Sequence, residues 1–586
     1  MVLFKSNSSQ IKYKRIILFL VAVLFVILTN PVWGQHQPLY ESEDRFHPVI
    51  AQNGMVATQE ALATQAGLAV LEEGGNAIDA AVTIGFTLAV TLPRAGNLGG
   101  GGFMLVHHAD SKETVAIDYR EKAPKGATRT MFLDENGELD SEKSRFSHLS
   151  VGVPGTVAGL TLALEKYGTI SLERALQPAI NFAKNGFVVS RDFYDSLGFA
   201  LPRMSNSTAS MEIFFKSGEE PYNAGDLFVQ KDLAETLELI AREGIQAFYR
   251  GKIADAIVAD MEANGGLITK EDLADYQPVI RQPVRGTYGD YEIYSMPPPS
   301  SGGIHLIQML NILEPFELKK FGHNTAQTIH LMAETMKLAY ADRSKYLGDP
   351  DFVPVPIAGL ISKDYAEELR DRVNLEQATP SSTILPGEPN HFSESNETTH
   401  YSIIDRYGNA VSNTYTLNFS YGTGITVPGT GILLNNEMDD FSAKPGVPNA
   451  YGLIGGEFNA IEPEKRMLSS MTPTIIMKNN RPFLVTGSPG GSRIITTVLQ
   501  LVLNVLEHDL NLAEATNAVR VHHQWIPDRL NVEKGLNHDT IQLLKEKGHN
   551  VQISDVMGST QSVMKKDRWF YGASDPRRVG ALTLGY

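Results

Sequence analysis

One stretch of the chain, residues 397–418, reads ETTHYSIIDRYGNAVSNTYTLN and predicts a β-hairpin. Its two arms, residues 400–404 and 410–417, are rich in Ile, Val, Tyr and Thr, which favour strands. Between the arms, the loop Arg406-Tyr407-Gly408 places glycine third, where a three-residue hairpin loop needs a left-handed backbone conformation. A short loop of this kind fixes which residues of the two arms face each other.

The register of this hairpin brings two threonines together. If Asp405 faces Asn409, the numbers of facing residues add up to 814, and Thr398 lies opposite Thr416. A β-bulge would shift this pairing by one residue. Two hydroxyl groups are therefore expected at the open end of the hairpin.

A threonine hydroxyl is a weak nucleophile unless a base lies beside it, and no pattern of histidine or lysine near Thr398 supplies one. Cleavage of the Glu397–Thr398 bond would supply a base. It would give Thr398 a free α-amine, whose pKa of about 8 suits general-base catalysis near neutral pH. Alternatively, Thr398 only begins a strand, and the hairpin by itself leaves both readings open.

Motifs along the chain favour cleavage before Thr398 over the alternative that Thr398 only begins a strand. They are NLGGGGF (97–103), DYREKAP (118–124), TTHYS (398–402), TYTLN (414–418), GILLNNEMDDF (431–441), LSSMTPT (468–474), GSPGGS (487–492), MGSTQS (557–562) and GASDPR (572–577). With these motifs the chain resembles the γ-glutamyltranspeptidases, which are N-terminal-nucleophile hydrolases made as a self-cleaving proenzyme. The first two motifs resemble the large subunit of that family and the others the small subunit.

The resemblance implies an α+β fold, a four-layer α/β/β/α sandwich of the N-terminal-nucleophile hydrolase type. It implies self-cleavage between Glu397 and Thr398 into a large subunit, 35–397, and a small subunit, 398–586. Both subunits would form one core. No cofactor is expected.

The resemblance also implies the chemistry. Thr398 would attack the γ-amide carbonyl of glutathione or another γ-glutamyl compound, with its own α-amine carrying the proton and Thr416 orienting its hydroxyl. Gly490 and Gly491 would form the oxyanion hole with their N–H groups. The resulting γ-glutamyl ester would pass to water, or to an amino acid or dipeptide acceptor.

A γ-glutamyl head group carries an α-carboxylate and an α-ammonium, so its site needs both signs of charge. The groups expected to hold the carboxylate are the planar guanidinium of Arg120 and the hydroxyls of Ser469 and Ser470. Those expected to hold the ammonium are Asp440, Glu437 and the carbonyl of Asn418. The loop 445–456, PGVPNAYGLIGG, resembles a lid found in some family members, with Tyr451 as its cover.

Two rival functions remain to be separated. A cephalosporin or glutaryl acylase of the same superfamily would share the nucleophile, but a glutaryl group has no ammonium for Asp440 and Glu437 to bind. A non-catalytic binding protein would keep the fold without cleavage. The joint presence of Arg120, Asp440 and Glu437 favours the γ-glutamyl substrate.

The N-terminus predicts a secretory signal peptide over residues 1–34. Basic residues between Lys5 and Arg15 precede an apolar run, 16–28, and a Val32-Trp33-Gly34 cleavage site. The run is short for a membrane span, and an uncleaved anchor is the alternative. The 586 residues include no cysteine, which fits the periplasm or secreted space of a bacterium and excludes a lipidated cysteine. No stable membrane anchor is expected after cleavage.

The net charge and the spacing of the histidines argue against binding of nucleic acid and of a metal ion. A formal net charge of −16 argues against nucleic acid. No metal site is expected, because the pairs His107-His108 and His522-His523 point to opposite faces of a strand and no His-Glu-x-x-His spacing occurs.

Hydrophobic periodicity and helix- or strand-breaking residues predict the remaining secondary structure. Segment 374–396, rich in polar residues, Pro and Gly, is expected to be an exposed tether that leads to the cleavage site. Helices are expected at 61–73, 77–92, 156–166, 172–185, 230–264, 304–314 and 325–345, and further strands at 103–107, 114–119 and 291–296.

Overall fold

The hairpin predicted from residues 397–418 lies in the middle of a seven-stranded sheet. Its strands are β12 (Thr399–Ile404) and β13 (Ala410–Thr416), and Thr399 pairs with Tyr415 and Ile404 with Ala410. These pairs have the predicted register. The Asp405 N–H donates to the Asn409 carbonyl at 3.1 Å, and Gly408 has a φ of 94°, as the loop requires.

The structure is a computed structural model that describes residues 44–387, 399–447, 449 and 452–586. Glu397, Thr398 and Tyr451 therefore lie outside the described residues. The unit His47–Tyr586 contains both sheets and the candidate site. Across the described ranges, every helix is too short or too polar to span a bilayer.

Two antiparallel seven-stranded sheets face each other. The first, here called the hairpin sheet, has the order β23 (Leu582–Gly585), β2 (Met55–Thr58), β12, β13, β3 (Gly101–His108), β4 (Glu113–Tyr119), β9 (Val279–Arg281). The second has the order β1 (Val49–Ala51), β22 (Trp569–Ser574), β21 (Gln561–Lys566), β17 (Arg481–Thr486), β16 (Thr474–Lys478), β11 (Tyr291–Ser295), β10 (Val284–Tyr288). Serine hydroxyls join the sheets, since Ser402 donates to the Gln561 carbonyl at 2.8 Å and Ser412 to that of Thr486 at 3.0 Å.

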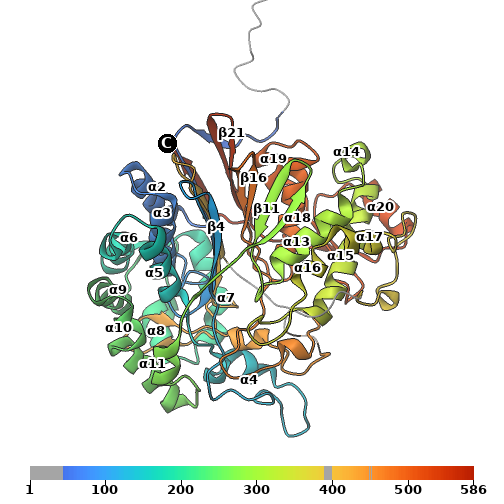
Figure 1. The fold of residues 1–586 in the computed structure, drawn as a ribbon. Coiled ribbons are helices and arrows are strands. Elements are labelled where there is room, and N and C mark those ends of the chain that lie inside the picture. Colours follow the sequence, from blue (N-terminus) through green and yellow to red (C-terminus); the bar gives the residue numbers. More distant parts are fainter. Residues whose placement is uncertain (1–43, 388–398, 448, 450–451) are drawn as a thin grey trace, which may run out of the picture. The chain divides into compact units, whose positions relative to one another are not determined.

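Helices cover the outer face of each sheet, which confirms the four-layer sandwich (Figure 1). The hairpin sheet is covered by α2 (Ala61–Glu72), α3 (Ala77–Thr91) and α5 (Thr156–Tyr167), with α6 (Leu172–Asn185) and α9 (Lys231–Glu243) outside them. On the far side of the second sheet lie α13 (Gly302–Leu313), α15 (Ala326–Tyr346) and α18 (Arg493–Leu506). The predicted helices and strands are all present, although 230–264 is divided into three helices.

The fold has further helices and strands. The helices are α4 (Ser141–Phe146), α7 (Arg191–Met204), α8 (Thr208–Phe214), α10 (Ile245–Tyr249), α11 (Lys252–Asn264), α12 (Lys270–Asp275), α14 (Leu318–Phe321), α16 (Ile357–Leu360), α17 (Lys363–Arg370), α19 (Leu512–Asn517), α20 (His538–Glu546) and the 3₁₀ turns η1 (His148–Ser150), η2 (Ser381–Thr383), η3 (Glu437–Asp440) and η4 (Glu457–Asn459). The short strands are β5 (Phe187–Val188), β6 (Phe215–Lys216), β7 (Glu220–Pro221), β8 (Leu227–Phe228), β14 (Thr426–Val427), β15 (Ile432–Leu433), β18 (Val521–His522), β19 (Leu530–Glu533) and β20 (Val551–Ser554).

Helix α3 lies directly behind the hairpin, and its sequence explains its place. All its residues are buried, as expected for a helix that is apolar on most sides. It begins with a capping box, in which the Asn76 side chain accepts from the N–H groups of Ile78 and Asp79 and the Asp79 carboxylate accepts from the Asn76 N–H. The tyrosines of the hairpin reach this helix, since Tyr401 donates to the Ala81 carbonyl at 2.9 Å.

The prediction that 374–396 is an exposed tether holds only in part for 374–387, which is mostly exposed but is anchored to the protein. Residues 374–387 lie on the protein, where Ser381 and Ile384 are buried. The Trp525 indole N–H donates to both of their carbonyls, at 3.0 and 3.1 Å. Polar composition concealed these contacts because they satisfy the backbone of the segment rather than its side chains. Residues 388–396 lie outside the described residues.

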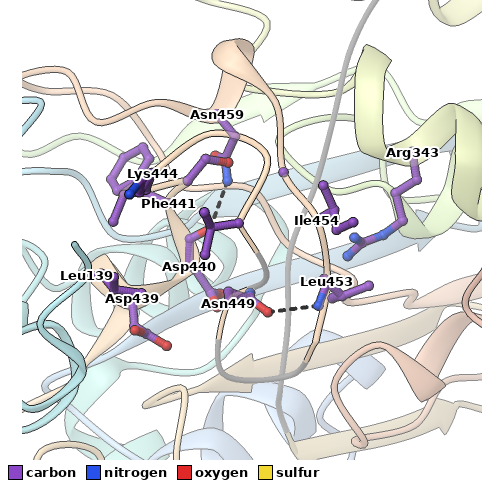
Figure 2. A pocket seen from close by; sticks show the side chains of 14 residues that line it. Leu139, Arg343, Asp439, Asp440, Phe441, Lys444, Asn449, Leu453, Ile454 and Asn459 are labelled. Atoms are coloured by element: carbon purple, nitrogen blue, oxygen red, sulfur yellow. Dashed lines mark hydrogen bonds between the residues drawn. The ribbon is translucent and has the colours of Figure 1, made fainter. Parts of the chain in front are cut away.

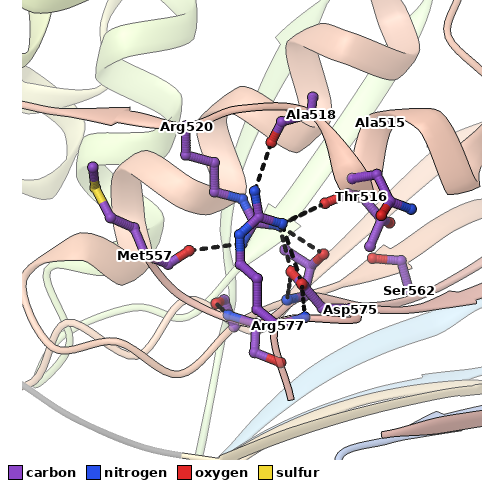
Figure 3. Close-up of polar contacts among 12 residues, drawn as sticks. Ala515, Thr516, Ala518, Arg520, Met557, Ser562, Asp575 and Arg577 are labelled. Atoms are coloured by element: carbon purple, nitrogen blue, oxygen red, sulfur yellow. Dashed lines mark hydrogen bonds and ion pairs between the residues drawn. The ribbon is translucent and has the colours of Figure 1, made fainter. Parts of the chain in front are cut away.

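A buried ion-pair cluster anchors the C-terminal motif GASDPR (Figure 3). Asp575 accepts from Arg520 at 2.6 Å and from Arg577 at 3.2 Å, and Arg577 also pairs with Glu533 at 2.6 Å. The Arg520 guanidinium further donates to the Met557 carbonyl at 2.7 Å. Burial by itself would raise the pKa of Asp575, but the two guanidiniums outweigh it and lower that pKa.

We expect Asp575→Asn to lower the free energy of unfolding by about 3–5 kcal/mol, because it leaves the buried guanidinium of Arg520 and the mostly buried one of Arg577 without this counter-ion. The midpoint of urea unfolding measures the change. Asp567→Asn, on the exposed turn between β21 and β22, is the matched control and should leave the midpoint unchanged.

The effect must also depend on pH. A carboxylate with a lowered folded-state pKa stabilises the fold above its unfolded pKa of about 3.9, and this stabilisation disappears as pH falls through the lower folded value. The difference between Asp575→Asn and the parent should therefore be full at pH 7 and shrink below about pH 4. An equal difference at both pH values would contradict the ion-pair explanation.

Candidate active site

Strand β13 ends at Thr416, in a tightly packed part of the hairpin sheet. The Thr416 hydroxyl oxygen accepts from the Asn418 N–H at 2.8 Å, which leaves its own O–H available to donate. The neighbouring glycine run, 99–102, is needed because larger side chains would collide with the residues around it. A Cβ atom at Gly100 would lie 2.0 Å from the Thr416 carbonyl oxygen, and one at Gly102 would lie 2.4 Å from the Tyr415 Cβ. The run therefore serves sheet packing at the end of the hairpin.

Gly490 and Gly491 lie on the loop between β17 and α18. Their φ angles of 136° and 62° lie in the left-handed region, which explains the two glycines. Within the described ranges, no group accepts a hydrogen bond from either N–H. Gly490 lines a cavity of about 70 Å³ together with Pro489, Thr416 and Asn418. The structure thus brings Gly490, one of the two predicted oxyanion donors, and the end of the hairpin to one cavity.

The buried His400 does not serve as a base at this site. Its ring nitrogens lie 2.8 Å from the Thr414 hydroxyl and 2.9 Å from that of Ser402. Burial lowers the pKa of His400 to about 3, so the ring is neutral. Its place is structural, since a Cβ atom at Gly487 would lie 2.4 Å from the ring.

Three of the predicted head-group residues form one buried cluster. Arg120 follows β4, while Glu437 and Asp440 belong to η3. Arg120 Nη1 lies 2.6 Å from Glu437 Oε2, and Nη2 lies 2.5 Å from Asp440 Oδ2. All three side chains have no exposed surface. The predicted groups of opposite charge are therefore adjacent, but here the acids bind Arg120 itself.

Glu121 adds a third carboxylate that the sequence analysis missed. Its Oε2 lies 3.5 Å from Arg120 Nη1, and its Oε1 has no hydrogen-bond partner among the described residues. Burial raises the pKa of Glu121 to about 8, although Arg120 opposes this rise. The only sequence feature that could have pointed to Glu121 was its position next to Arg120 in the motif DYREKAP.

The cluster has three carboxyl groups around one guanidinium. Burial raises the pKa of Glu437 well above its ordinary value, and Arg120 only partly offsets this. Burial would lower the pKa of Arg120, but Glu437, Glu121 and Asp440 outweigh it and raise that pKa. One guanidinium thus faces three carboxyl groups, and a second cation would be stabilised there.

Ser469 and Ser470 lie on the chain leading into β16. The Ser469 hydroxyl oxygen accepts from the Met471 N–H at 3.1 Å. The Ser470 hydroxyl accepts from Arg343 Nη2 at 2.8 Å. Arg343, on α15, is a second buried guanidinium that the sequence analysis missed, and burial lowers its pKa to about 9. Nothing in its helical segment distinguishes it from a surface arginine, since the contact joins residues 127 positions apart.

The described part of loop 445–456 lies over Asp440 (Figure 2). The Asn449 N–H donates to the Leu453 carbonyl at 2.9 Å, and the Leu453 N–H donates to Asn449 Oδ1 at 3.2 Å. Asn459 fixes the other side by donating to the Asp440 carbonyl at 2.7 Å. These residues and Arg343 line a small cavity of about 20 Å³. The role of Tyr451 stays a prediction.

Another polar cluster joins α15 to the segment after α20. Ligand atoms of His330, Glu334 and His549 lie within 4.8 Å of one another, as in some metal sites. However, His330 Nδ1 is 2.7 Å from His549 Nε2, and the Lys337 ammonium is 2.8 Å from the Glu334 carboxylate. Because that ammonium would repel a cation, we interpret the cluster as a hydrogen-bonded network. His330 and Glu334 also bond the backbone of Asn374 and Thr379, which ties the predicted tether to α15.

Comparison with known proteins supports the family suggested by the motifs. Residues 63–584 match the family model described as Gamma-glutamyltranspeptidase. The chain is 58% identical over 549 residues to the glutathione hydrolase proenzyme of Escherichia coli (strain K12), covering 93% of this chain and 94% of that protein.

Solved structures agree with the fold. The cephalosporin acylase from Bacillus halodurans has a TM-score of 0.82 at 29% identity, and the likeness covers 93% of this chain and 98% of that one. A Helicobacter pylori gamma-glutamyltranspeptidase chain has a TM-score of 0.55 at 52% identity, covering 56% of this chain and 93% of that one. On the family model and the Escherichia coli relative, the chain belongs to the gamma-glutamyltranspeptidase family.

Proposed function

We propose that this protein cleaves the γ-glutamyl amide bond of glutathione and related compounds, and transfers the glutamyl group to water, amino acids or dipeptides. The observation that carries the proposal is the buried cluster of Arg120, Glu437 and Asp440. Burying these charges is costly unless they serve one another or a ligand. Membership of the family supports the same activity.

The proposed reaction has two steps. The Thr398 hydroxyl oxygen attacks the γ-carbonyl carbon while the Thr398 α-amine takes the hydroxyl proton. The C–N bond then breaks, the amine product leaves with that proton, and a γ-glutamyl ester remains on Thr398. Water or an acceptor amine attacks the ester carbonyl, and the Thr398 oxygen regains a proton as it leaves.

Thr416, Gly490 and Gly491 have supporting roles in this proposal. The free O–H of Thr416 would orient the Thr398 oxygen. The N–H groups of Gly490 and Gly491, unused by the described residues, would stabilise the negative charge on the carbonyl oxygen in both steps. Preorganised donors of this kind avoid reorganisation during the reaction.

Binding of the head group would replace the ion pairs between Arg120 and the two acids with ion pairs to the ligand. Its α-carboxylate would take the guanidinium of Arg120 and the hydroxyls of Ser469 and Ser470. Its α-ammonium would take Asp440, Glu437 and the Asn418 carbonyl, so that each protein charge keeps a partner of opposite sign. The excess of carboxyl groups around Arg120 favours a ligand that brings a cation. This favours γ-glutamyl donors over the glutaryl donors of an acylase.

The proposal includes the processing of the chain. Residues 1–34 would direct export to the periplasm or secreted space and be removed. Cleavage at Glu397–Thr398 would then give the large subunit, 35–397, and the small subunit, 398–586. The enzyme would be this pair of subunits.

The first prediction is that Thr398→Ala remains a single chain, because the Thr398 oxygen must attack the preceding carbonyl for cleavage. A denaturing gel of the purified variant measures this directly. Thr399→Ala, which removes the neighbouring hydroxyl, should still be cut. Cleavage of the Thr398→Ala variant at the same bond would refute self-processing by this residue.

Asp440→Asn should reduce kcat/KM for a γ-glutamyl anilide by about one to two orders of magnitude, because it removes a counter-ion of the α-ammonium. A glutaryl anilide has no ammonium and should be affected far less. Steady-state kinetics with both donors on the processed variant test this. If both donors lose the same factor, the pocket does not recognise the α-amine, and the acylase function replaces ours.

Arg120→Lys should lower kcat/KM for the γ-glutamyl anilide by at least about tenfold, through loss of a charge-assisted bond worth roughly 1.5–3 kcal/mol. Lysine keeps the positive charge among the acids but lacks the planar fork. Circular dichroism checks that the fold is retained. Activity within twofold of the parent would show that the guanidinium geometry is not used.

A further inference from the structure

The cavity beside Thr416 and Gly490 has a wall that the proposed donor site does not use. Besides Thr416, Asn418, Pro489 and Gly490, it is lined by Gln59, Arg94 and Arg578, which come from distant parts of the chain. Gln59 follows β2, Arg94 follows α3, and Arg578 lies just beyond the anchored motif GASDPR. Two arginines and a glutamine therefore line the cavity that also contains Gly490, a candidate oxyanion donor.

Gln59 offers this cavity an unused donor. The side chain is 3% exposed, and its Oε1 accepts from the Thr399 hydroxyl at 2.8 Å. Its Nε2 is buried and has no hydrogen-bond partner within the described part of the chain. A buried N–H₂ group without an acceptor costs free energy, unless a ligand supplies that acceptor.

The two arginines give the wall a net positive charge. Arg94 pairs with Asp192 at 2.9 Å, whereas no carboxylate of the described residues lies within 4 Å of the Arg578 guanidinium. Both arginines line the same cavity. Burial lowers the pKa of Arg94, and Arg578 lowers it further while Asp192 opposes both. One of the two positive charges is thus left to attract an anion.

We propose that Gln59, Arg94 and Arg578 form the site for the carboxylate of the acceptor. The inference rests on the proposed transferase function. During transfer the glutamyl group occupies the pocket of Arg120, so an acceptor cannot use that guanidinium. An amino acid or dipeptide still has to present its amine to the ester carbonyl, near Gly490. A second cationic wall on the same cavity would hold its carboxylate while the amine attacks.

The step balances as an acyl transfer. The acceptor nitrogen forms a bond to the ester carbonyl carbon, the bond from that carbon to the Thr398 oxygen breaks, and the acceptor proton passes through the Thr398 α-amine to that oxygen. Water needs no carboxylate site for the same attack. The wall therefore favours transfer over hydrolysis for anionic acceptors only.

The test compares glycylglycine with glycylglycinamide, which differ only in the terminal carboxylate. With a γ-glutamyl anilide as donor, the parent should prefer glycylglycine, and Arg578→Gln should lower kcat/KM for glycylglycine by about tenfold. The value for glycylglycinamide should change by less than about twofold. Arg578 is exposed, so this variant is expected to fold. Arg94→Gln should act in the same direction.

Arg568→Gln is the matched control, because Arg568 is exposed at the other end of β22 and lies over Trp569. It should leave the ratio of the two acceptors unchanged. An equal fall for both acceptors in Arg578→Gln, or a parent that does not distinguish them, would overturn the acceptor site. A parent that neither hydrolyses nor transfers the γ-glutamyl group would instead overturn the proposed function, and the acceptor site with it.

Discussion

The arrangement of the candidate site depends on the burial of one guanidinium among three carboxyl groups. The Arg120 side chain has no exposed surface, and the carboxyl groups that face it in the described part of the chain are those of Glu121, Glu437 and Asp440. Such a cluster has a large desolvation cost and gains little net stability over an apolar one. The proposed recognition of a ligand that carries both charges would explain its presence. The cluster also joins β4 to η3, so it exists only when both proposed subunits are folded together.

The rest of the fold holds this cluster and the hairpin at fixed positions. Strand β4 delivers Arg120, β13 delivers Thr416 and Asn418, and the turn into α18 presents Gly490 and Gly491. Close backbone approach at Gly100 and Gly102 keeps β3 against the hairpin. Rigid strands in a central sheet can position reacting groups more accurately than surface loops can.

Local patterns predicted much of this structure. The hairpin register followed from one glycine loop, and α3 followed from its cap and its apolar run. Contacts between distant residues could not be predicted in the same way. The sequence indicated that Arg120, Glu437 and Asp440 belong to one site, but not that they bind each other. The roles of Arg343 and Gln59 and the anchoring of residues 374–387 carried no local signal, since their partners lie far along the chain. The proposed nucleophile Thr398 lies outside the described residues and remains a prediction.

The order of strands in the hairpin sheet has a consequence for the proposed cleavage. Strands β12 and β13 lie between β2 on one side and β3 on the other, while β23, from the very end of the chain, closes the edge next to β2. The two pieces therefore alternate within one hydrogen-bonded layer, and the second layer alternates in the same way, with β11 and β10 beside β16. Cutting the chain once would not make two separable proteins. Dissociation would require breaking, in both sheets, several strand pairs that join one piece to the other. The cleaved pair should therefore survive dilution that separates ordinary subunits. Each piece alone would expose unpaired strand edges.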